Sequence, residues 1–208
     1  MTPASTLAQG LQGLGLSLPD ETSLKLLAYV DLLAKWNRTY NLTAIREPER
    51  MVSHHLIDSL SVLPHLPQGT LVDVGAGGGL PGIPIAIVQP GRRVTLNDSS
   101  HKKGAFMQQA VIELGLANVS VHVGRAEDWH PEERFDGAIS RAFAELTDFI
   151  AACRHLVRPG GGFAAMKGVY PHEEIAKVPA GVKCALPIRL AVPLVDGDRH
   201  LVLCSLEA

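Results

Sequence analysis

A glycine-rich segment that directly follows a short apolar stretch constrains the fold more than any other feature of the chain. Leu71–Val74 has the length and composition of a buried strand, and five glycines follow it between residues 75 and 82. Gly77, Gly79 and Gly82 fit the spacing G-x-G-x-x-G, which is typical of a strand–turn–helix unit that binds a nucleotide cofactor. A turn that serves only chain geometry is the alternative. The pattern predicts a cofactor site in which Gly77 or Gly79 has a positive φ or lies against the ligand.

Apolar strands and helical segments alternate after residue 70, which predicts an α/β fold. Strands are expected at 70–74, 93–96, 119–123, 136–140 and 163–166, and helices ending near Pro90 and at 99–114 and 144–157. The alternation predicts a mostly parallel sheet with helices on both faces. Two further strands, 188–192 and 201–206, flank Asp196-Gly197, a strong hairpin signal that predicts an antiparallel C-terminal edge.

The first third of the chain is expected to be helical. One helix begins after Pro19 with acidic residues in its first turn, and a second opens after Pro48 and stops at Pro64. We therefore expect two parts, a helical cap at residues 1–65 and a cofactor-binding domain at residues 66–208.

Composition excludes several classes of protein. The 208 residues are 46% hydrophobic and contain no apolar run long enough for a membrane span, so a cytoplasmic protein is expected. A net charge of −2 argues against a free-standing nucleic-acid binder, so any RNA function must depend on a local basic patch. Cys153, Cys184 and Cys204 have no short spacing and are expected to be buried thiols rather than a disulfide framework.

The acids at the strand ends indicate which cofactor binds. A pyrophosphate gains nothing from a carboxylate before the glycines, yet Asp73 stands there, two residues ahead of Gly75. A cofactor with a cationic amino-acid end and no phosphate fits better, and S-adenosylmethionine is such a molecule. Asp98, at the end of the second strand, is expected to bind the ribose hydroxyls or to cap the helix that begins at Ser99. Residues 124–128 are expected near the adenine edge.

The loop after the fourth strand is expected to face the transferred methyl group. Ser140-Arg141-Ala142-Phe143 contains neither the Asn-Pro-Pro-Tyr motif of amine methylation nor the Pro-Cys motif of pyrimidine carbon methylation. This favours a target atom with a free lone pair, which needs orientation rather than a base. Arg141 and Phe143 are the positioning candidates, and no residue is assigned as a catalytic acid or base.

Several motifs together resemble the bacterial 16S ribosomal RNA guanine-N7 methyltransferase G family, also called the glucose-inhibited division protein B family. They lie along nearly the whole chain: Trp36-Asn37, Asn41-Leu42-Thr43, His55–Leu60, Gly79-Leu80-Pro81-Gly82-Ile83-Pro84, Asp98-Ser99, Lys102-Lys103, Phe135-Asp136-Gly137, Ser140-Arg141-Ala142, Met166-Lys167-Gly168 and Arg199-His200-Leu201.

The resemblance implies a class I S-adenosylmethionine-dependent methyltransferase fold with an N-terminal helical extension. It also implies methyl transfer to N7 of one guanine in 16S ribosomal RNA near the decoding centre, in the small subunit or an assembly intermediate. By the same resemblance Gly75, Leu80, Ala126, Glu127 and Arg141 contact the cofactor. With the residues above, the expected cofactor set is Asp73, Gly75, Gly77, Leu80, Asp98, Ser99, Ala126, Glu127 and Arg141.

The remaining expectations concern RNA, metal and rival functions. Lys102, Lys103, Lys167 and Arg199 are the candidates for RNA phosphate contact. His55 and Asp58 lie one helical turn apart but lack further ligands, so no metal is expected. The alternatives are a non-catalytic RNA-binding or ribosome-assembly module and, from the literal glycine spacing, a nicotinamide-dependent oxidoreductase.

Overall fold

The computed structural model describes residues 1–141, 143 and 145–207. Ala142 of the expected loop after the fourth strand, Ala144 at the expected start of a helix, and the C-terminal Ala208 lie outside the described residues.

Helices and strands alternate as the sequence predicts, with additional short elements. The helices are α1 (Pro3–Gly13), α2 (Asp20–Tyr40), α3 (Pro48–Met51), α4 (Asp58–Leu60), α5 (Gly82–Val88), α6 (His101–Glu113), α7 (Leu146–Cys153) and α8 (His172–Ala176). A π-helix, η1 (Val52–Ile57), joins α3 to α4, and short 3-10 turns are η2 (Leu63–His65), η3 (Ala126–Asp128) and η4 (Arg154–Leu156). The strands are β1 (Leu71–Val74), β2 (Val94–Asp98), β3 (Val119–Val123), β4 (Phe135–Ser140), β5 (Val157–Lys167), β6 (Val182–Cys184), β7 (Ile188–Arg189) and β8 (His200–Leu206).

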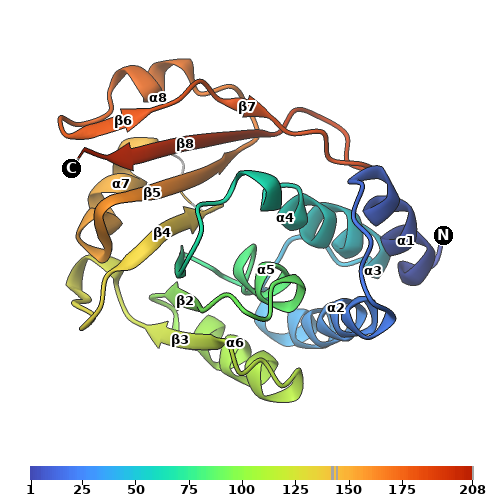
Figure 1. Cartoon of the computed structure of the whole chain (residues 1–208). Helices are drawn as coiled ribbons and strands as arrows, with labels where there is room; N and C mark the ends of the chain where they lie inside the picture. The colour runs from blue at the N-terminus through green and yellow to red at the C-terminus, as the bar shows by residue number, and fades with distance from the viewer. Residues whose placement is uncertain (142, 144, 208) are drawn as a thin grey trace.

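The strands form one sheet in the order β3-β2-β1-β4-β5-β8-β6, with β7 also paired to β8 (Figure 1). The first five strands are parallel, and β8 runs antiparallel to β5, β6 and β7. The expected antiparallel C-terminal edge is therefore confirmed. The expected strand at 188–192 is shorter, because β7 pairs with β8 at only two positions, and β6, which the sequence did not predict, forms the edge.

Helices cover both faces of the sheet, which confirms the expected layering (Figure 1). The N-terminal helices, α5 and α6 share one buried apolar cluster with one face, and α7 packs on the other face through a second cluster. Tyr29 of α2 is fully buried and donates its hydroxyl to the carbonyl of Gly78 at 2.5 Å. The N-terminal helices thus directly support the glycine segment.

The N-terminal segment differs in detail from the expectation. A capping box at Thr2 and Ser5 starts α1, which the sequence pattern did not reveal. The helix that begins at Pro48 changes to π geometry over Val52–Ile57, a form that often marks functional positions. No helix among the described residues has the length and apolar character required to cross a bilayer.

The expectation that all three cysteines are buried thiols is wrong for two of them. Cys184 and Cys204 form a disulfide, because the antiparallel register of β6 and β8 places them directly opposite each other, with Cα atoms 3.9 Å apart. A separation of 20 residues gave no sign of this pairing. Cys153 is a buried free thiol, and burial raises its pKa.

Candidate functional site: two cavities around the glycine loop

The glycine loop follows β1 and has two distinct surfaces. Gly77 has a φ of 61°, and a Cβ placed on it would meet only the carbonyl oxygen of Gly75, at 3.9 Å. Gly79 has a φ of 80°, and a Cβ there would collide with the side chain of Ile83. Gly79 therefore permits packing of the loop against α5, while Gly77 leaves backbone exposed to an open space that a ligand can fill.

Asp73 supports the loop from within the core. Its Oδ2 accepts a hydrogen bond from the Gly82 amide at 2.7 Å, and its Oδ1 is buried without a partner among the described residues. Burial raises the pKa of Asp73 to about 7, although the Gly82 amide and the Arg141 charge lower it. Asp73 lies outside the sets of residues that line the cavities, so the structure places it next to the loop rather than on the ligand surface.

Asp98 links three parts of the site at the end of β2. Its Oδ2 accepts from the Gly77 amide at 2.9 Å and lies 3.4 Å from Nζ of Lys103, and its Oδ1 accepts from the Ser100 amide at 2.9 Å. The carboxylate is buried. Asp98 therefore fixes the glycine loop and the start of α6 while also lining a cavity.

Two cavities meet at this loop. The Asp98 cavity has a volume of about 320 Å³ and is lined by Val74, Gly75, Asn97, Asp98, Ser99, Lys103, Gly124, Arg125, Ala126, Glu127 and Phe143. The Thr43 cavity has about 200 Å³ and is lined by Leu42, Thr43, Gly75, Ala76, Gly77, Gly78, Leu80, Lys103 and Arg141. Gly75 and Lys103 line both. The two cavities together contain every predicted cofactor residue except Asp73, and they also contain Phe143.

One wall of the Thr43 cavity, Leu42 and Thr43, comes from the N-terminal segment, to which the sequence pattern assigned no role in the site. Asn37 accepts from the Thr43 amide at 2.9 Å and donates to the Ile45 carbonyl at 3.1 Å. Burial and the charge of Arg141 lower the pKa of His55 to about 3, so its ring is neutral. Nδ1 of His55 donates to the His54 carbonyl at 3.1 Å, which leaves Nε2 to accept from the Thr43 hydroxyl at 2.8 Å. The Asn41-Leu42-Thr43 motif was the sequence feature from which this part of the site could have been predicted.

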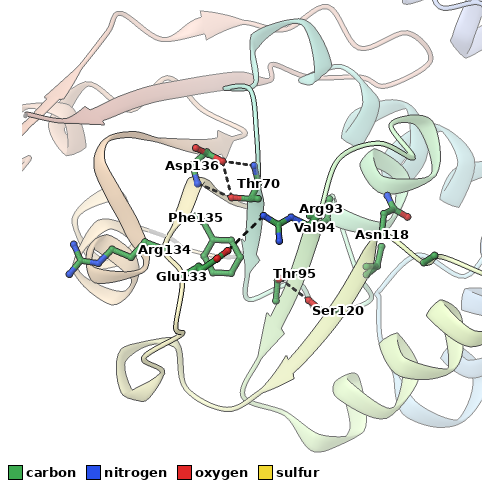
Figure 2. A pocket seen from close by; sticks show the side chains of 12 residues that line it. Thr70, Arg93, Val94, Thr95, Asn118, Ser120, Glu133, Arg134, Phe135 and Asp136 are labelled. Atoms are coloured by element: carbon green, nitrogen blue, oxygen red, sulfur yellow. Dashed lines mark hydrogen bonds and ion pairs between the residues drawn. The ribbon is translucent and has the colours of Figure 1, made fainter.

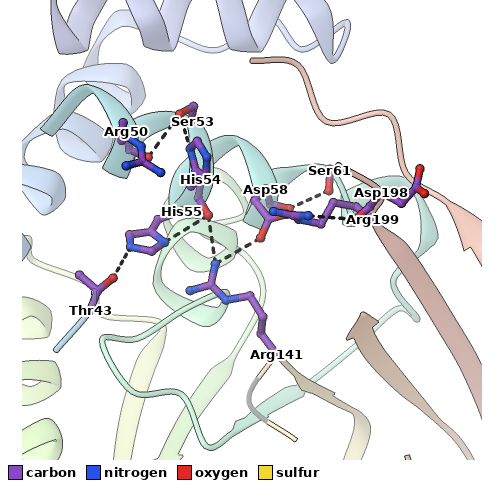
Figure 3. Close-up of polar contacts among 10 residues, drawn as sticks. All are labelled: Thr43, Arg50, Ser53, His54, His55, Asp58, Ser61, Arg141, Asp198 and Arg199. Carbon is purple, nitrogen blue, oxygen red and sulfur yellow. Dashed lines mark hydrogen bonds and ion pairs between the residues drawn. The ribbon is translucent and has the colours of Figure 1, made fainter. Parts of the chain in front are cut away.

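A third cavity adjoins the second through Arg141. The Asp58 cavity has about 370 Å³ and is lined by Ile45, His54, His55, Asp58, Arg141, Met166, Lys167, Gly168, Leu190, Arg199 and His200. Figure 3 shows Arg141 and Arg199 converging on Asp58. Nη1 of Arg141 also donates to the His54 carbonyl at 3.3 Å.

The predicted RNA contacts occupy different surroundings. Lys102 is exposed on α6, whereas Lys103 pairs with Asp98 between the two cofactor-side cavities. Lys167 is buried, and its Nζ lies 2.6 Å from Glu174 and 3.2 Å from the Phe143 carbonyl. Arg199 pairs with Asp58 at 3.2 Å. Lys167 and Arg199 both line the Asp58 cavity, whereas Lys102 and Lys103 belong to α6. The position of Lys103 five residues after Asp98 was a sequence signal for their pairing.

The largest of these cavities lies at the opposite end of the strands (Figure 2). The Phe135 cavity has about 470 Å³ and is lined by Thr70, Arg93, Val94, Thr95, Ala117, Asn118, Val119, Ser120, Glu133, Arg134, Phe135 and Asp136. Its polar groups serve the fold: Asp136 accepts from the Thr70 amide at 2.7 Å and pairs with Arg158, and both contacts lower its pKa to about 2. Ligands of open α/β sheets bind at the carboxyl ends of the strands, so we assign the site to the glycine loop.

The residues present fit S-adenosylmethionine. The Asp98 cavity offers the Asp98 carboxylate among its lining groups, and the Thr43 cavity offers Arg141 and open backbone at Gly77. No group of three or more histidine, cysteine, aspartate or glutamate side chains suited to a metal ion occurs in the described part of the chain.

Comparisons with solved structures identify the fold. The chain superposes on TrmN from Thermus thermophilus with a TM-score of 0.58 and 17% identity, covering 82% of this chain and 53% of that one. It superposes on the O-methyltransferase TomG from Streptomyces achromogenes, solved in complex with S-adenosylmethionine, with a TM-score of 0.57 and 19% identity over 86% of this chain and 90% of that one. The expected class I S-adenosylmethionine-dependent methyltransferase fold is confirmed.

Sequence comparison identifies the family. The family described as GidB, rRNA small subunit methyltransferase G, matches residues 22–202. Proteins named ribosomal RNA small subunit methyltransferase G are 53% identical in Chromobacterium violaceum, over 97% of both chains, and 53% identical in Aromatoleum aromaticum, over 96% of this chain and 97% of the relative. This chain therefore belongs to the rRNA small subunit methyltransferase G family.

Proposed function

We propose that the chain transfers the methyl group of S-adenosylmethionine to N7 of a guanine in 16S ribosomal RNA. The observation that carries this proposal is the pair of cavities that share Gly75 and Lys103, in a chain whose family is the rRNA small subunit methyltransferase G family. The substrate is the RNA within the small subunit or an assembly intermediate. Such a substrate places the enzyme in the cytoplasm.

The two cavities divide the binding of the cofactor. Asp98, Ser99, Ala126 and Glu127 line the cavity suited to the adenosine part, and Asp98 at the end of β2 is the acceptor for the ribose hydroxyls. Gly77, Leu80 and Arg141 line the cavity suited to the amino-acid end. Asp73 keeps the loop in place through the Gly82 amide and contributes to this end indirectly.

The chemistry requires positioning more than proton transfer. When bound, S-adenosylmethionine supplies an electrophilic methyl group. Guanine N7 carries an in-plane lone pair and loses no proton on methylation, so no residue of the chain has to act as a base. Arg141 and Phe143 follow β4 and line these cavities, where they are suited to orient the base and exclude water.

RNA binding depends on local charge, because the chain as a whole carries −2. Exposed Lys102 is suited to a phosphate contact as it stands. Lys103, Lys167 and Arg199 each already pair with a carboxylate, so their contribution to RNA binding depends on what those carboxylates hold in place.

The test is methyl transfer followed by mapping of the product. Purified protein is incubated with methyl-labelled S-adenosylmethionine and either unmodified small subunits or bare 16S RNA, and cleavage specific for 7-methylguanine locates the label. We expect label at N7 of one guanine. Label on another atom would refute the N7 assignment, and cofactor binding without transfer to either substrate would favour the non-catalytic RNA-binding alternative.

A further inference from the structure

One buried carboxylate holds two arginines that come from distant parts of the chain (Figure 3). Oδ2 of Asp58 lies 3.2 Å from Nη1 of Arg141, and Oδ1 lies 3.2 Å from Nε of Arg199. Arg141 is 83 residues away and follows β4, and Arg199 is 141 residues away and precedes β8. The Asp58 side chain is only 5% exposed, whereas those of the arginines are 26% and 28% exposed. The carboxylate is therefore the fixed point of the cluster, and the guanidinium groups reach the surface of the cavity.

The cavity that these arginines line carries a surplus of positive charge. Two guanidinium groups share one carboxylate, while Lys167 has Glu174 as its own partner at 2.6 Å. His55 is neutral, for the reason given above. The remaining positive charge and the cavity volume of about 370 Å³ suit an anion.

A polar atom of the cavity wall also lacks a partner. His200 is 7% exposed, lines the Asp58 cavity, and has no hydrogen-bond partner for Nδ1 among the described residues. Its ring lies edge-on to Tyr170, with centroids 5.3 Å apart, so the ring orientation is supported on another side. Nδ1 itself is enclosed, so the ring forms part of the cavity wall without presenting this nitrogen at its surface.

The reaction restricts how arginines can contact the target base. The commonest arginine contact to guanine is a fork on O6 and N7, and such a fork would occupy the lone pair that receives the methyl group. Arg141 lines both the Thr43 cavity, assigned to the cofactor, and the Asp58 cavity, so its guanidinium group lies at the junction of the two. Asp58 accepts from the Arg141 guanidinium at 3.2 Å, and an arginine held in this way is not free to form that fork.

We propose that Asp58 is a positioning residue that orients Arg141 and Arg199 as a pair in the Asp58 cavity, where they bind a phosphate of the RNA backbone next to the target guanosine. The inference rests on the proposed function, because it takes the RNA as substrate. It assigns the Asp58 cavity to the RNA and the other two cavities to the cofactor.

Asp58→Asn separates positioning from simple electrostatics. Removal of a carboxylate makes the surface more positive, which on charge alone should strengthen RNA binding. If Asp58 orients the arginines, the variant should instead weaken equilibrium binding of 16S RNA and raise the KM for unmodified small subunits, each by about tenfold or more, as for loss of one charge-assisted hydrogen bond. Affinity for S-adenosylmethionine, measured by calorimetry, should fall much less than affinity for RNA, because Arg141 lines a cofactor-side cavity and Arg199 does not.

Asp198→Asn is the matched control, because Asp198 pairs with Arg189 on the surface at 2.7 Å and lies outside the cavity lining. It removes the same charge without removing the acceptor of the two arginines, so it should leave RNA binding unchanged or slightly stronger and should not slow transfer. Arg199→Lys keeps the charge, loses the planar fork and changes a partly exposed side chain, so it provides a second test if Asp58→Asn fails to fold. Asp58→Asn combined with Arg199→Lys should weaken RNA binding by less than the product of the two separate fold-changes, since both substitutions act on one contact.

Unchanged or stronger RNA binding by folded Asp58→Asn would overturn the proposal. Parallel loss of cofactor and RNA binding would also overturn it, because that result indicates a purely structural role. If Asp58→Asn does not fold, unchanged RNA affinity and KM in Arg199→Lys overturn it. Wild-type protein that binds cofactor and RNA but transfers no methyl group would refute the proposed function, while the comparison of RNA affinities would still decide the role of Asp58.

Discussion

The cofactor-side cavities and the Asp58 cavity share Arg141 but are built in different ways. Asp98 ends β2, and Ser99, Ala126 and Glu127 follow β2 or the neighbouring parallel strand β3. Sheet topology alone brings such positions together. The Asp58 cluster instead joins a π-helix junction, the loop after β4 and the turn before β8. A site at strand ends follows from the fold, whereas the Asp58 cluster depends on how the helical segment packs against the sheet.

The largest expected loss of cofactor binding comes from filling the open space next to Gly77 in the glycine loop. Gly77→Val should abolish binding of S-adenosylmethionine, because the side chain would enter the Thr43 cavity at a φ of 61°. Gly115→Val is the control: Gly115 has a φ of 60°, and no atom lies within 4 Å of its added Cβ. Both substitutions carry about 1–2 kcal/mol of backbone strain, but only the first should lose the calorimetric signal. Normal cofactor binding by Gly77→Val would show that the loop is not the cradle.

A second substitution removes the carboxylate that joins the loop to α6. Asp98→Ala should weaken S-adenosylmethionine binding by about 1.5–3 kcal/mol, since it removes a charge-assisted acceptor and releases the Gly77 amide. Asp128→Ala, an exposed acid nearby that does not line the cavity, should bind normally. Equal affinities in the two variants would remove Asp98 from the ribose assignment.

Asp73, beside the glycine loop, and His55, in the Asp58 cavity, should make the free energy of unfolding depend on pH with opposite signs. The folded-state pKa of Asp73 is raised from 3.8 to about 7, so the folded state holds a proton that the unfolded state loses, and stability falls as pH rises through that window. The pKa of His55 is lowered from 6.5 to about 3, so the unfolded state holds the extra proton and stability rises with pH over that window. Each slope has a limit of about 1.4 kcal/mol per pH unit, and between roughly pH 4 and 6.5 they oppose each other.

Chemical denaturation across that range tests the opposition. Asp73→Asn should leave a stability that rises with pH, and His55→Gln should leave one that falls. Asp136→Asn is the control, because the lowered pKa of Asp136, about 2, confines its effect on the slope to pH values below about 4. If the free energy of unfolding has the same pH slope in Asp73→Asn as in wild type, burial does not raise the pKa of Asp73.

The smallest expected effect separates adjacent lysines. Lys102→Ala should lower the salt dependence of RNA binding by about one unit and leave cofactor binding unchanged, because Lys102 is exposed. Lys103→Ala should weaken cofactor binding, because Lys103 lines both cofactor-side cavities and pairs with Asp98. Filter binding over a salt series measures the RNA effect, and calorimetry measures cofactor affinity. If both variants change the two quantities equally, Lys102 is not specific to RNA and Lys103 is not specific to the cofactor.

The sequence predicted the parts that depend on local pattern. Alternating apolar segments predicted β1 to β4 and the helices between them. Strand-end positions predicted that Asp98 and residues 124–128 lie near the cofactor, and the family resemblance added Gly75, Leu80 and Arg141. The roles of Thr43 and Asp58 could not be predicted, because each depends on packing between remote segments. The disulfide depends on the register of β6 against β8, and β6 was too short to show a strand pattern.

Arg141 lines both the Thr43 cavity and the Asp58 cavity, so it gives the most direct test of the assignment of one cavity to the cofactor and the other to RNA. In a single-turnover experiment with saturating cofactor and unmodified small subunits, Arg141→Lys should transfer the methyl group about tenfold or more slowly than wild type, because the lysine keeps the charge but loses the planar fork. The binding of S-adenosylmethionine and the fraction of folded protein are measured in parallel. A transfer rate per folded molecule near the wild-type value, with only a lowered melting temperature, would contradict the account and reduce Arg141 to a structural ion pair.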